Sequence, residues 1–125
     1  VKLVPWRESE LDGAILSSAG QDIPALASLV DVAIPMAFSH ILGRDLAWKE
    51  ALLDHVRTLT GKPVGCYVQT NQLFRDEEIP VGQVATELEA ALSGGYGAIP
   101  IFWYEQLAQS PAVIEAIRRI LKPNP

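Results

Sequence analysis

The distribution of hydrophobic residues divides the chain into four units, each an apolar segment followed by a longer amphipathic segment. The apolar segments, Lys2–Trp6, Asp31–Phe38, Pro63–Gln69 and Ala98–Trp103, begin roughly 30 residues apart, the size of one strand–helix unit. A short run that is apolar at successive positions is typical of a strand buried on both faces of a parallel sheet. The pattern therefore predicts an α/β fold of four consecutive strand–helix units around a parallel sheet.

Helices are predicted over 46–60, 81–93 and 111–121, where apolar residues recur at helical spacing. Asp45 is placed to cap the first of these helices, and Gly61 is placed to end it in the left-handed conformation. Ser110-Pro111, a cap followed by a proline at the first helical position, starts the third. The expected buried stripes are Trp48, Leu52, Val56 and Leu59; Val84, Leu88, Ala91 and Leu92; and Val113, Ile114, Ile117, Ile120 and Leu121.

The remaining segments are less periodic. Residues 7–21 read as a long loop with a turn of helix around Ala14–Ser17, since Gly13 and Gly20 interrupt any longer pattern. Asp22 is placed to cap a short helix over 24–29. Residues 70–80 form a polar, charged loop between the third apolar segment and the next helix.

Composition indicates one soluble globular domain spanning residues 1–125. The chain has 125 residues, of which 49% are hydrophobic and 20% are charged. The net charge is −5 and the longest basic run is Arg118-Arg119, so nucleic acid and anionic membranes are not expected as partners. No apolar run approaches the roughly 20 residues that span a bilayer, and no signal peptide is recognisable. The sequence does not indicate a cellular compartment.

The apolar segments leave two arrangements open. In the second segment Val32, Ile34 and Met36 alternate with residues that are equally apolar, so neither side of the strand is polar. Helices on one side only would expose a large hydrophobic surface, which soluble monomers avoid. Either another half closes a barrel, or helices cover both sides of a doubly wound, flavodoxin-like sheet. The chain also begins within a predicted strand and without methionine, which suggests a piece of a longer protein.

Two of these segments carry a resemblance. Val30–His40 resembles the sixth-strand region of chitinase-like and related glycoside hydrolase barrels, and Gly97–Glu105 is similar to the last strand of the same superfamily. The resemblance implies that the chain is the C-terminal (β/α)4 half of a TIM barrel. It implies that Trp103 stacks on a sugar and that Phe38 takes the place of the aromatic residue ending strand six. The chain departs from the family pattern, which has Tyr-Asp where Phe38 and Ser39 stand.

The resemblance also limits the expected function, because the family's catalytic acid would precede residue 1. We therefore expect a glycoside hydrolase-like fragment that binds carbohydrate and supplies at most supporting catalytic groups. The missing partner would be an N-terminal half-barrel. The alternative is a non-catalytic half-barrel module that self-associates into a homo-oligomer through its apolar sheet face.

Active sites of parallel α/β barrels lie at the carboxyl ends of the strands and in the loops that follow. Aromatic rings suit the flat C–H faces of sugars, and amides and carboxylates suit their hydroxyl groups. Asp22 and Glu105 are the only plausible pair of catalytic carboxylates. Asp22 is first of all a helix cap, and a surface glutamate that opens a loop is an equally good interpretation of Glu105. His40 is alone and next to a loop, where a histidine is more often solvated than catalytic. The expected substrate-binding residues are Trp6, Phe38, His40, Gln69, Asn71, Trp103 and Tyr104.

Other chemistries find less support. The loops after the third and fourth apolar segments lack the glycines that expose backbone N–H groups to phosphate, and no dinucleotide or P-loop motif is present. His40 and His55 are widely separated, and Cys66 lies in a strand pattern as a small buried hydrophobe. No cofactor and no metal are therefore expected.

Overall fold

The computed structural model describes residues 1–11 and 13–122. Its strands are two residues long and form two separate parallel pairs. Within each pair the register is regular, with Leu3 opposite Pro35 and Gln69 opposite Phe102. Between the pairs the described residues form only the single bridge Ala33–Val64, and a second isolated bridge, Gly65–Ala98, precedes the β3–β4 pair. The strands are β1 (Lys2–Leu3), β2 (Ile34–Pro35), β3 (Val68–Gln69) and β4 (Ile101–Phe102).

The expectation of one four-stranded parallel sheet is therefore wrong. Because the sheet is split into two short pairs, a (β/α)4 half of a TIM barrel is not shown, and neither is the doubly wound alternative. Proline explains the break beside β2. The Ala33 N–H donates to the Pro63 carbonyl at 3.0 Å, and the Gly65 N–H returns a bond to the Ala33 carbonyl at 2.9 Å. The next donor on that side would be Pro35, which has no N–H.

Most helix boundaries match the expectation. Helices α1 (Ala14–Ser17), α4 (Leu46–Thr60), α5 (Val81–Ser93) and α7 (Pro111–Leu121) lie where the pattern placed them, and α2 (Ile23–Ala27) is shifted slightly. The caps of α4 confirm the expectation, whereas Ser110 makes no side-chain cap bond to α7 and its Oγ donates instead to the Gln106 carbonyl at 3.1 Å. Asp45 Oδ1 accepts from the Trp48 N–H at 2.8 Å, and Gly61 ends the helix at φ 64°. The elements that the sequence did not indicate are the 3₁₀ turn η1 (Glu8–Glu10) and the helices α3 (Ser39–Leu42) and α6 (Tyr104–Ala108).

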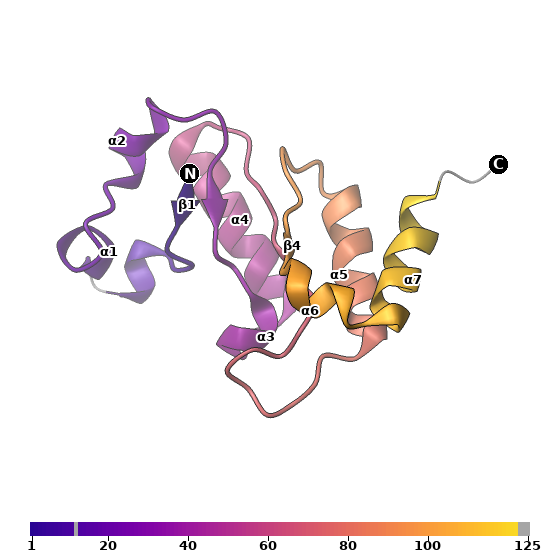
Figure 1. Cartoon of the computed structure of the whole chain (residues 1–125). Coiled ribbons are helices and arrows are strands. Elements are labelled where there is room, and N and C mark those ends of the chain that lie inside the picture. Colours follow the sequence, from indigo (N-terminus) through magenta and orange to yellow (C-terminus); the bar gives the residue numbers. More distant parts are fainter. Residues whose placement is uncertain (12, 123–125) are drawn as a thin grey trace.

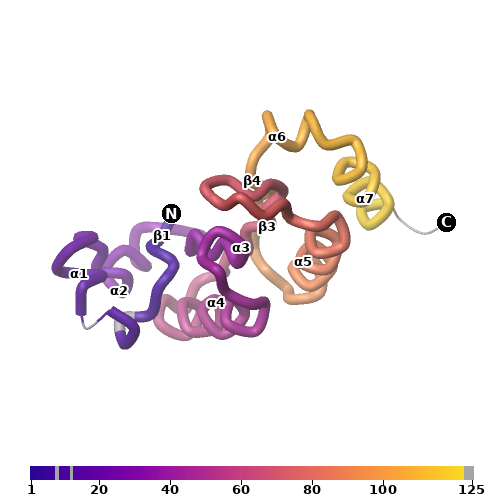
Figure 2. Tube along the Cα trace, turned by 90° about the horizontal axis from the view of Figure 1, so that it is seen from below, coloured from indigo at the N-terminus to yellow at the C-terminus, as the bar shows by residue number. Residues whose placement is uncertain are grey.

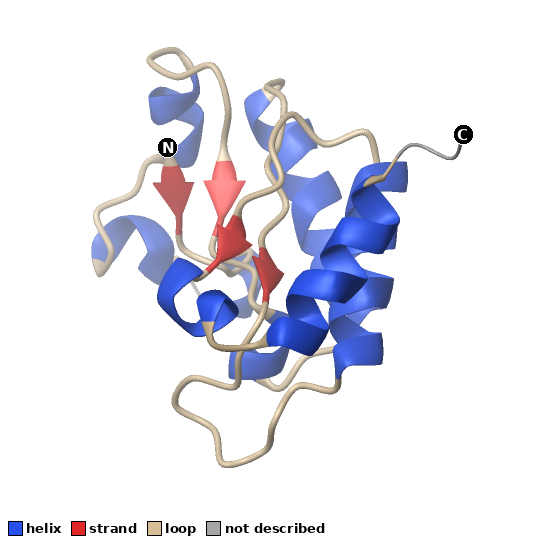
Figure 3. Ribbon diagram, turned by 45° about the vertical axis from the view of Figure 1, so that its right-hand side comes forward, coloured by secondary structure: helices blue, strands red, loops and turns tan. Residues whose placement is uncertain are grey.

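The chain order runs across the molecule. Figure 1 places α1 and α2 at one side, α4 next to them, and α5 and α7 at the other side, and Figure 2 shows the same order from below. The four strands point in the same direction (Figure 3). The carboxyl ends of the strands therefore lie on one edge, which places α3, α6 and the loop 70–80 together beside that edge.

Burial alternates along the second apolar segment, whereas residues 64–71 of the third are buried at every position. In the second segment Ala33 and Ala37 are fully buried, while Ile34, Met36 and Phe38 on the alternate positions are half-buried. The helical stripes are partly as expected. Leu59, Leu92 and Leu121 are exposed rather than buried, and Lys49 and Glu87 are buried in place of apolar residues. No helix within residues 1–11 and 13–122 is long and apolar enough to cross a membrane.

The buried charges form an ion pair between α4 and α5. Lys49 Nζ donates to Glu87 Oε2 at 2.8 Å and to the Tyr67 carbonyl at 2.6 Å. Ser39 Oγ donates to the other carboxylate oxygen at 2.5 Å, and Gln83 Nε2 donates to the same oxygen at 3.3 Å. Burial raises the pKa of Glu87, but the Lys49 charge and these hydrogen bonds outweigh it, so the pKa lies below 4.5. The pair fixes α3, α4 and α5 to the segment that leads into β3.

Candidate functional site

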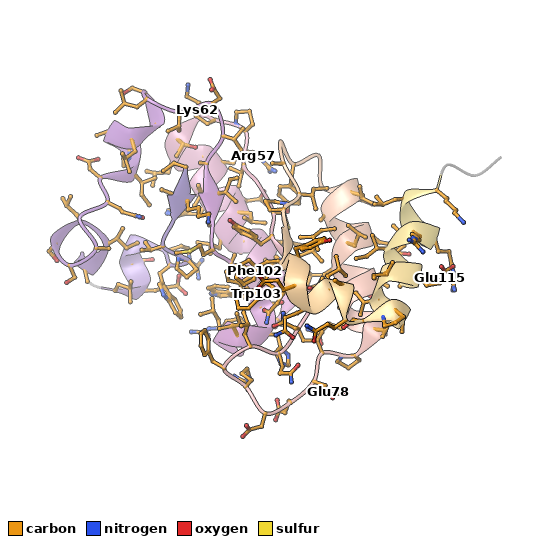
Figure 4. The ribbon with its side chains drawn as sticks, viewed as in Figure 1. Arg57, Lys62, Glu78, Phe102, Trp103 and Glu115 are labelled. Carbon is orange, nitrogen blue, oxygen red and sulfur yellow. The ribbon has the colours of Figure 1, made fainter. Side chains whose placement is uncertain are left out.

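Aromatic side chains cluster where β2, β3 and β4 meet. The Phe38 ring centroid lies 4.8 Å from those of Tyr67 and Phe102, and the Phe102 ring lies 5.1 Å from Trp103 in an edge-on arrangement. Figure 4 shows Phe102 and Trp103 next to each other near the middle of the molecule. The peptide bond between these two residues is cis. The structure thus brings together Phe38 and Trp103, two of the residues expected to bind substrate.

The Gln69 side-chain amide is hydrogen-bonded to the backbone around it. Its side chain is 2% exposed; its Oε1 accepts from the Ile41 N–H at 3.3 Å, and its Nε2 donates to the Asn71 carbonyl at 2.6 Å. Both ends of the amide are therefore used to hold α3 and the start of loop 70–80 against β3. Gln69 positions the residues that follow it.

Asn71 keeps one donor unused. Its Oδ1 accepts from the Leu73 N–H at 3.0 Å, and the residue is 8% exposed. Among the residues that the structure describes, its Nδ2 finds no hydrogen-bond partner, and the same holds for Nε1 of Trp103. A buried donor without a partner costs about 1–3 kcal/mol. Thr70, which precedes Asn71, is bonded through its N–H to the Phe102 carbonyl at 2.9 Å, so the two unused donors follow adjoining strand ends.

Two clefts meet at Asn71. One, of about 440 Å³, lies between loop 70–80 and α6, and Phe74 and Arg75 line it. The other, of about 310 Å³, continues towards the first turn of α7. Asn71, Gln72 and Gln106 line both clefts. We call the combined space the strand-end groove, defined by these three amide residues.

The outer end of the strand-end groove carries an aromatic ring and charges. The Phe74 side chain is 93% exposed although it lines the groove. Arg75 lies 3.5 Å from a carboxylate oxygen of Glu77, and Asp76 and Glu78 line the two clefts. The rim therefore carries more negative than positive charge, which disfavours an acidic ligand.

Other expected residues lie outside this groove. The His40 ring Nε2 lies 2.8 Å from the Glu77 carbonyl and so contacts the loop. Tyr104 and Glu105 are exposed on α6, with Tyr104 80% exposed. Trp6 packs edge-on against Trp48 at 5.7 Å. His40 thus supports the loop beside the groove, while Trp6 belongs to a different part of the molecule.

The two candidate catalytic carboxylates are not brought together. Asp22 caps α2, where its Oδ1 accepts from the Ala25 N–H at 3.0 Å. Glu105 lies on α6, and Figures 1 and 2 both place α2 and α6 far apart, with β1 and α3 between them. A glycosidase needs its two carboxyl groups within roughly 5–10 Å of each other. The geometry therefore offers binding groups at the strand ends without this carboxylate pair.

No group of three or more His, Cys, Asp or Glu side chains within the described part of the chain could hold a metal ion. Cys66 is 3% exposed, and burial raises the pKa of its thiol above 9.0. Because the thiolate is the reactive form, this cysteine is poorly suited to nucleophilic chemistry.

Sequence reasoning missed Gln72, Phe74 and Gln106 as groove residues. Gln72 and Phe74 lie in the loop that the pattern marked as polar, so the exposed phenylalanine in a polar loop was the available signal. Gln106 could not be found in this way, because α6 positions it at the groove and the pattern did not indicate this helix.

Comparison of the chain with protein-family models, with curated proteins and with solved structures gives no match.

Proposed function

We propose that the chain binds a carbohydrate in the strand-end groove. The observation that carries the proposal is the meeting of three amide side chains, Asn71, Gln72 and Gln106, in one groove with the exposed ring of Phe74 at its end. Amides both donate to and accept from hydroxyl groups, and an aromatic ring packs on the apolar face of a sugar. The resemblance of the second and fourth apolar segments to glycoside hydrolase strands agrees with this ligand class.

Asn71 is the central residue of this proposal. Its Nδ2 has no partner in the described structure, whereas its Oδ1 is held by the Leu73 N–H. A sugar hydroxyl oxygen accepts from Nδ2 and removes the cost of the unused donor. Since Nδ2 is covered from solvent, this contact requires the sugar to displace the atoms that cover it.

Trp103, which the resemblance implied would stack on a sugar, lines neither cleft of the strand-end groove and supports the proposed site only through its neighbours. It directly follows β4 and packs edge-on against Phe102, which is hydrogen-bonded to the residue before Asn71. The proposal concerns binding and includes no bond cleavage, because Asp22 and Glu105 lie on distant helices.

Isothermal titration calorimetry with neutral hexasaccharides of glucose, xylose, mannose and N-acetylglucosamine tests the proposal. The wild-type chain is expected to bind at least one of them. Asn71→Asp keeps the acceptor for Leu73 and removes the donor, so binding should weaken about tenfold, equivalent to about 1.4 kcal/mol. Gln106→Ala, on the exposed face of α6, should weaken binding without affecting folding.

Gln109→Ala is the matched control, since this exposed amide also lies next to α6 but lines neither cleft of the groove. Absence of binding to all four hexasaccharides by the folded wild-type chain would overturn the proposal. Binding that Asn71→Asp and Gln106→Ala both leave unchanged would overturn it as well.

A further inference from the structure

A second cleft lies at the other side of the molecule. It has a volume of about 300 Å³ and is enclosed by α1, the start of α2, the second half of α4 and the loop after β1. Ile15 and Ile23, which are 2% and 5% exposed, form buried parts of its lining, and Trp6 forms another part. We call this space the N-terminal cleft. It is separate from the strand-end groove, with which it shares no lining residue.

The lining of the N-terminal cleft is predominantly apolar, and part of it faces solvent. Leu16 is 56% exposed and Leu59 is 40% exposed, although both line the cleft. Filling the cleft with an apolar group would remove these side chains from water, which is favourable at about 25 cal/mol per Å² of apolar surface. A volume near the lower end of the range for small-molecule sites fits a small ligand and not a helix.

The polar groups of the cleft favour a cation. Among the described lining residues Asp22 is the one carboxylate; it is exposed, and of its two oxygens only Oδ1 is engaged, by the Ala25 N–H. The Gln21 oxygen is already used by the Val4 N–H at 2.9 Å. His55 is the other titratable side chain in the lining, and no lysine or arginine lines the cleft among the described residues.

We propose that the N-terminal cleft binds a small apolar molecule with a single ammonium head. Trp6, Ile15 and Ile23 surround the apolar body, and the free carboxylate oxygen of Asp22 accepts from the ammonium group. This binding site is independent of the carbohydrate site and does not require it.

A matched series of probes tests this proposal on the whole chain. 2-Phenylethylamine, 2-phenylethanol and phenylacetate share one aromatic body and differ in the charge of the head. Their binding is followed through the NMR signals of the Trp6 indole and the Leu59 methyl groups. The amine is expected to bind about fivefold more tightly than the alcohol, as for an ion pair near the surface, and phenylacetate is expected to bind most weakly.

Two variants assign the effect. Asp22→Asn preserves the helix cap, since asparagine caps as well as aspartate, so the variant folds and should lose the preference for the amine. His55→Gln removes the other titratable group and should keep the preference. The proposal is overturned if all three probes bind equally, if none perturbs Trp6 and Leu59, or if Asp22→Asn retains the preference for the amine.

Discussion

Removing the charge of Lys49 should destabilise the fold strongly. The Lys49 side chain is 1% exposed and its partner Glu87 is 7% exposed, so the ion pair is shielded from water. In Lys49→Met the buried carboxylate keeps its bonds from Ser39 and Gln83 but loses its counter-charge, and the Tyr67 carbonyl loses its donor. Methionine fills a similar volume, so the loss comes from charge and hydrogen bonding more than from a cavity.

The expected loss is about 3–5 kcal/mol, the usual effect of removing one partner of a buried ion pair. Domains of this size have stabilities of about 5–15 kcal/mol, so Lys49→Met should shift the urea midpoint visibly or leave the chain partly unfolded. Urea unfolding followed by circular dichroism at pH 7 measures the change. The double variant Lys49→Met, Glu87→Leu should recover most of the loss, because no unpaired charge remains.

The exposed ion pair between Asp54 and Arg57 is the matched control. Its N–O distance is 2.6 Å, but the two side chains are 68% and 41% exposed, so Asp54→Asn should cost less than about 1 kcal/mol. A loss below about 1 kcal/mol in Lys49→Met would refute the reasoning. So would a double variant that is no more stable than the single variant.

Four further results follow from the structure. Because the folded pKa of Glu87 lies below its unfolded value of 4.5, its contribution to stability is present above pH 4.5 and lost as pH falls through the folded pKa. The free energy of unfolding should therefore fall less steeply with decreasing pH in Glu87→Gln than in the wild-type chain. Carbon-detected NMR should find the pKa of Glu10 at about 2, and Arg7→Ala should move it towards 4.5, because Arg7 supplies the main hydrogen bond. Asp45→Ala removes the cap of α4 and should cost about 0.5–2 kcal/mol in urea unfolding. Cys66 should react with thiol reagents only when the chain unfolds, so that its labelling in native buffer is much slower than in urea; equally fast labelling in both would contradict its burial.

Helix boundaries could be predicted from the sequence because they depend on neighbouring residues. Asp45 and Gly61 delimit α4, and Pro111 begins α7, as local capping rules require. The strands could not be predicted to the same extent, since apolar character alone does not show where a ladder continues. Pro35 ends the pairing on one side of β2, and its effect depends on which neighbour each N–H faces.

The candidate site was predictable only in part, because its residues come from segments far apart in the sequence. The rule that selects strand ends found Asn71, but the groove around it also needs Gln106 from α6 and Phe74 from the loop. The predicted set of buried helix residues was wrong where an ion pair between two helices outweighs hydrophobicity. Lys49 is buried because Glu87 lies opposite it on another helix, a contact between residues 38 positions apart.

Side-chain amide signals in a ¹H–¹⁵N NMR titration test the carbohydrate proposal most directly. The probe is the neutral hexasaccharide that binds most tightly in calorimetry. The account predicts that the amide signals of Asn71 and Gln106 shift progressively and saturate together, while the Gln21 amide in the N-terminal cleft stays unchanged. The account is contradicted if the amide signals of Asn71 and Gln106 stay fixed while other signals report that the sugar binds elsewhere. It is also contradicted if no signal in the spectrum shifts at a saturating concentration of sugar.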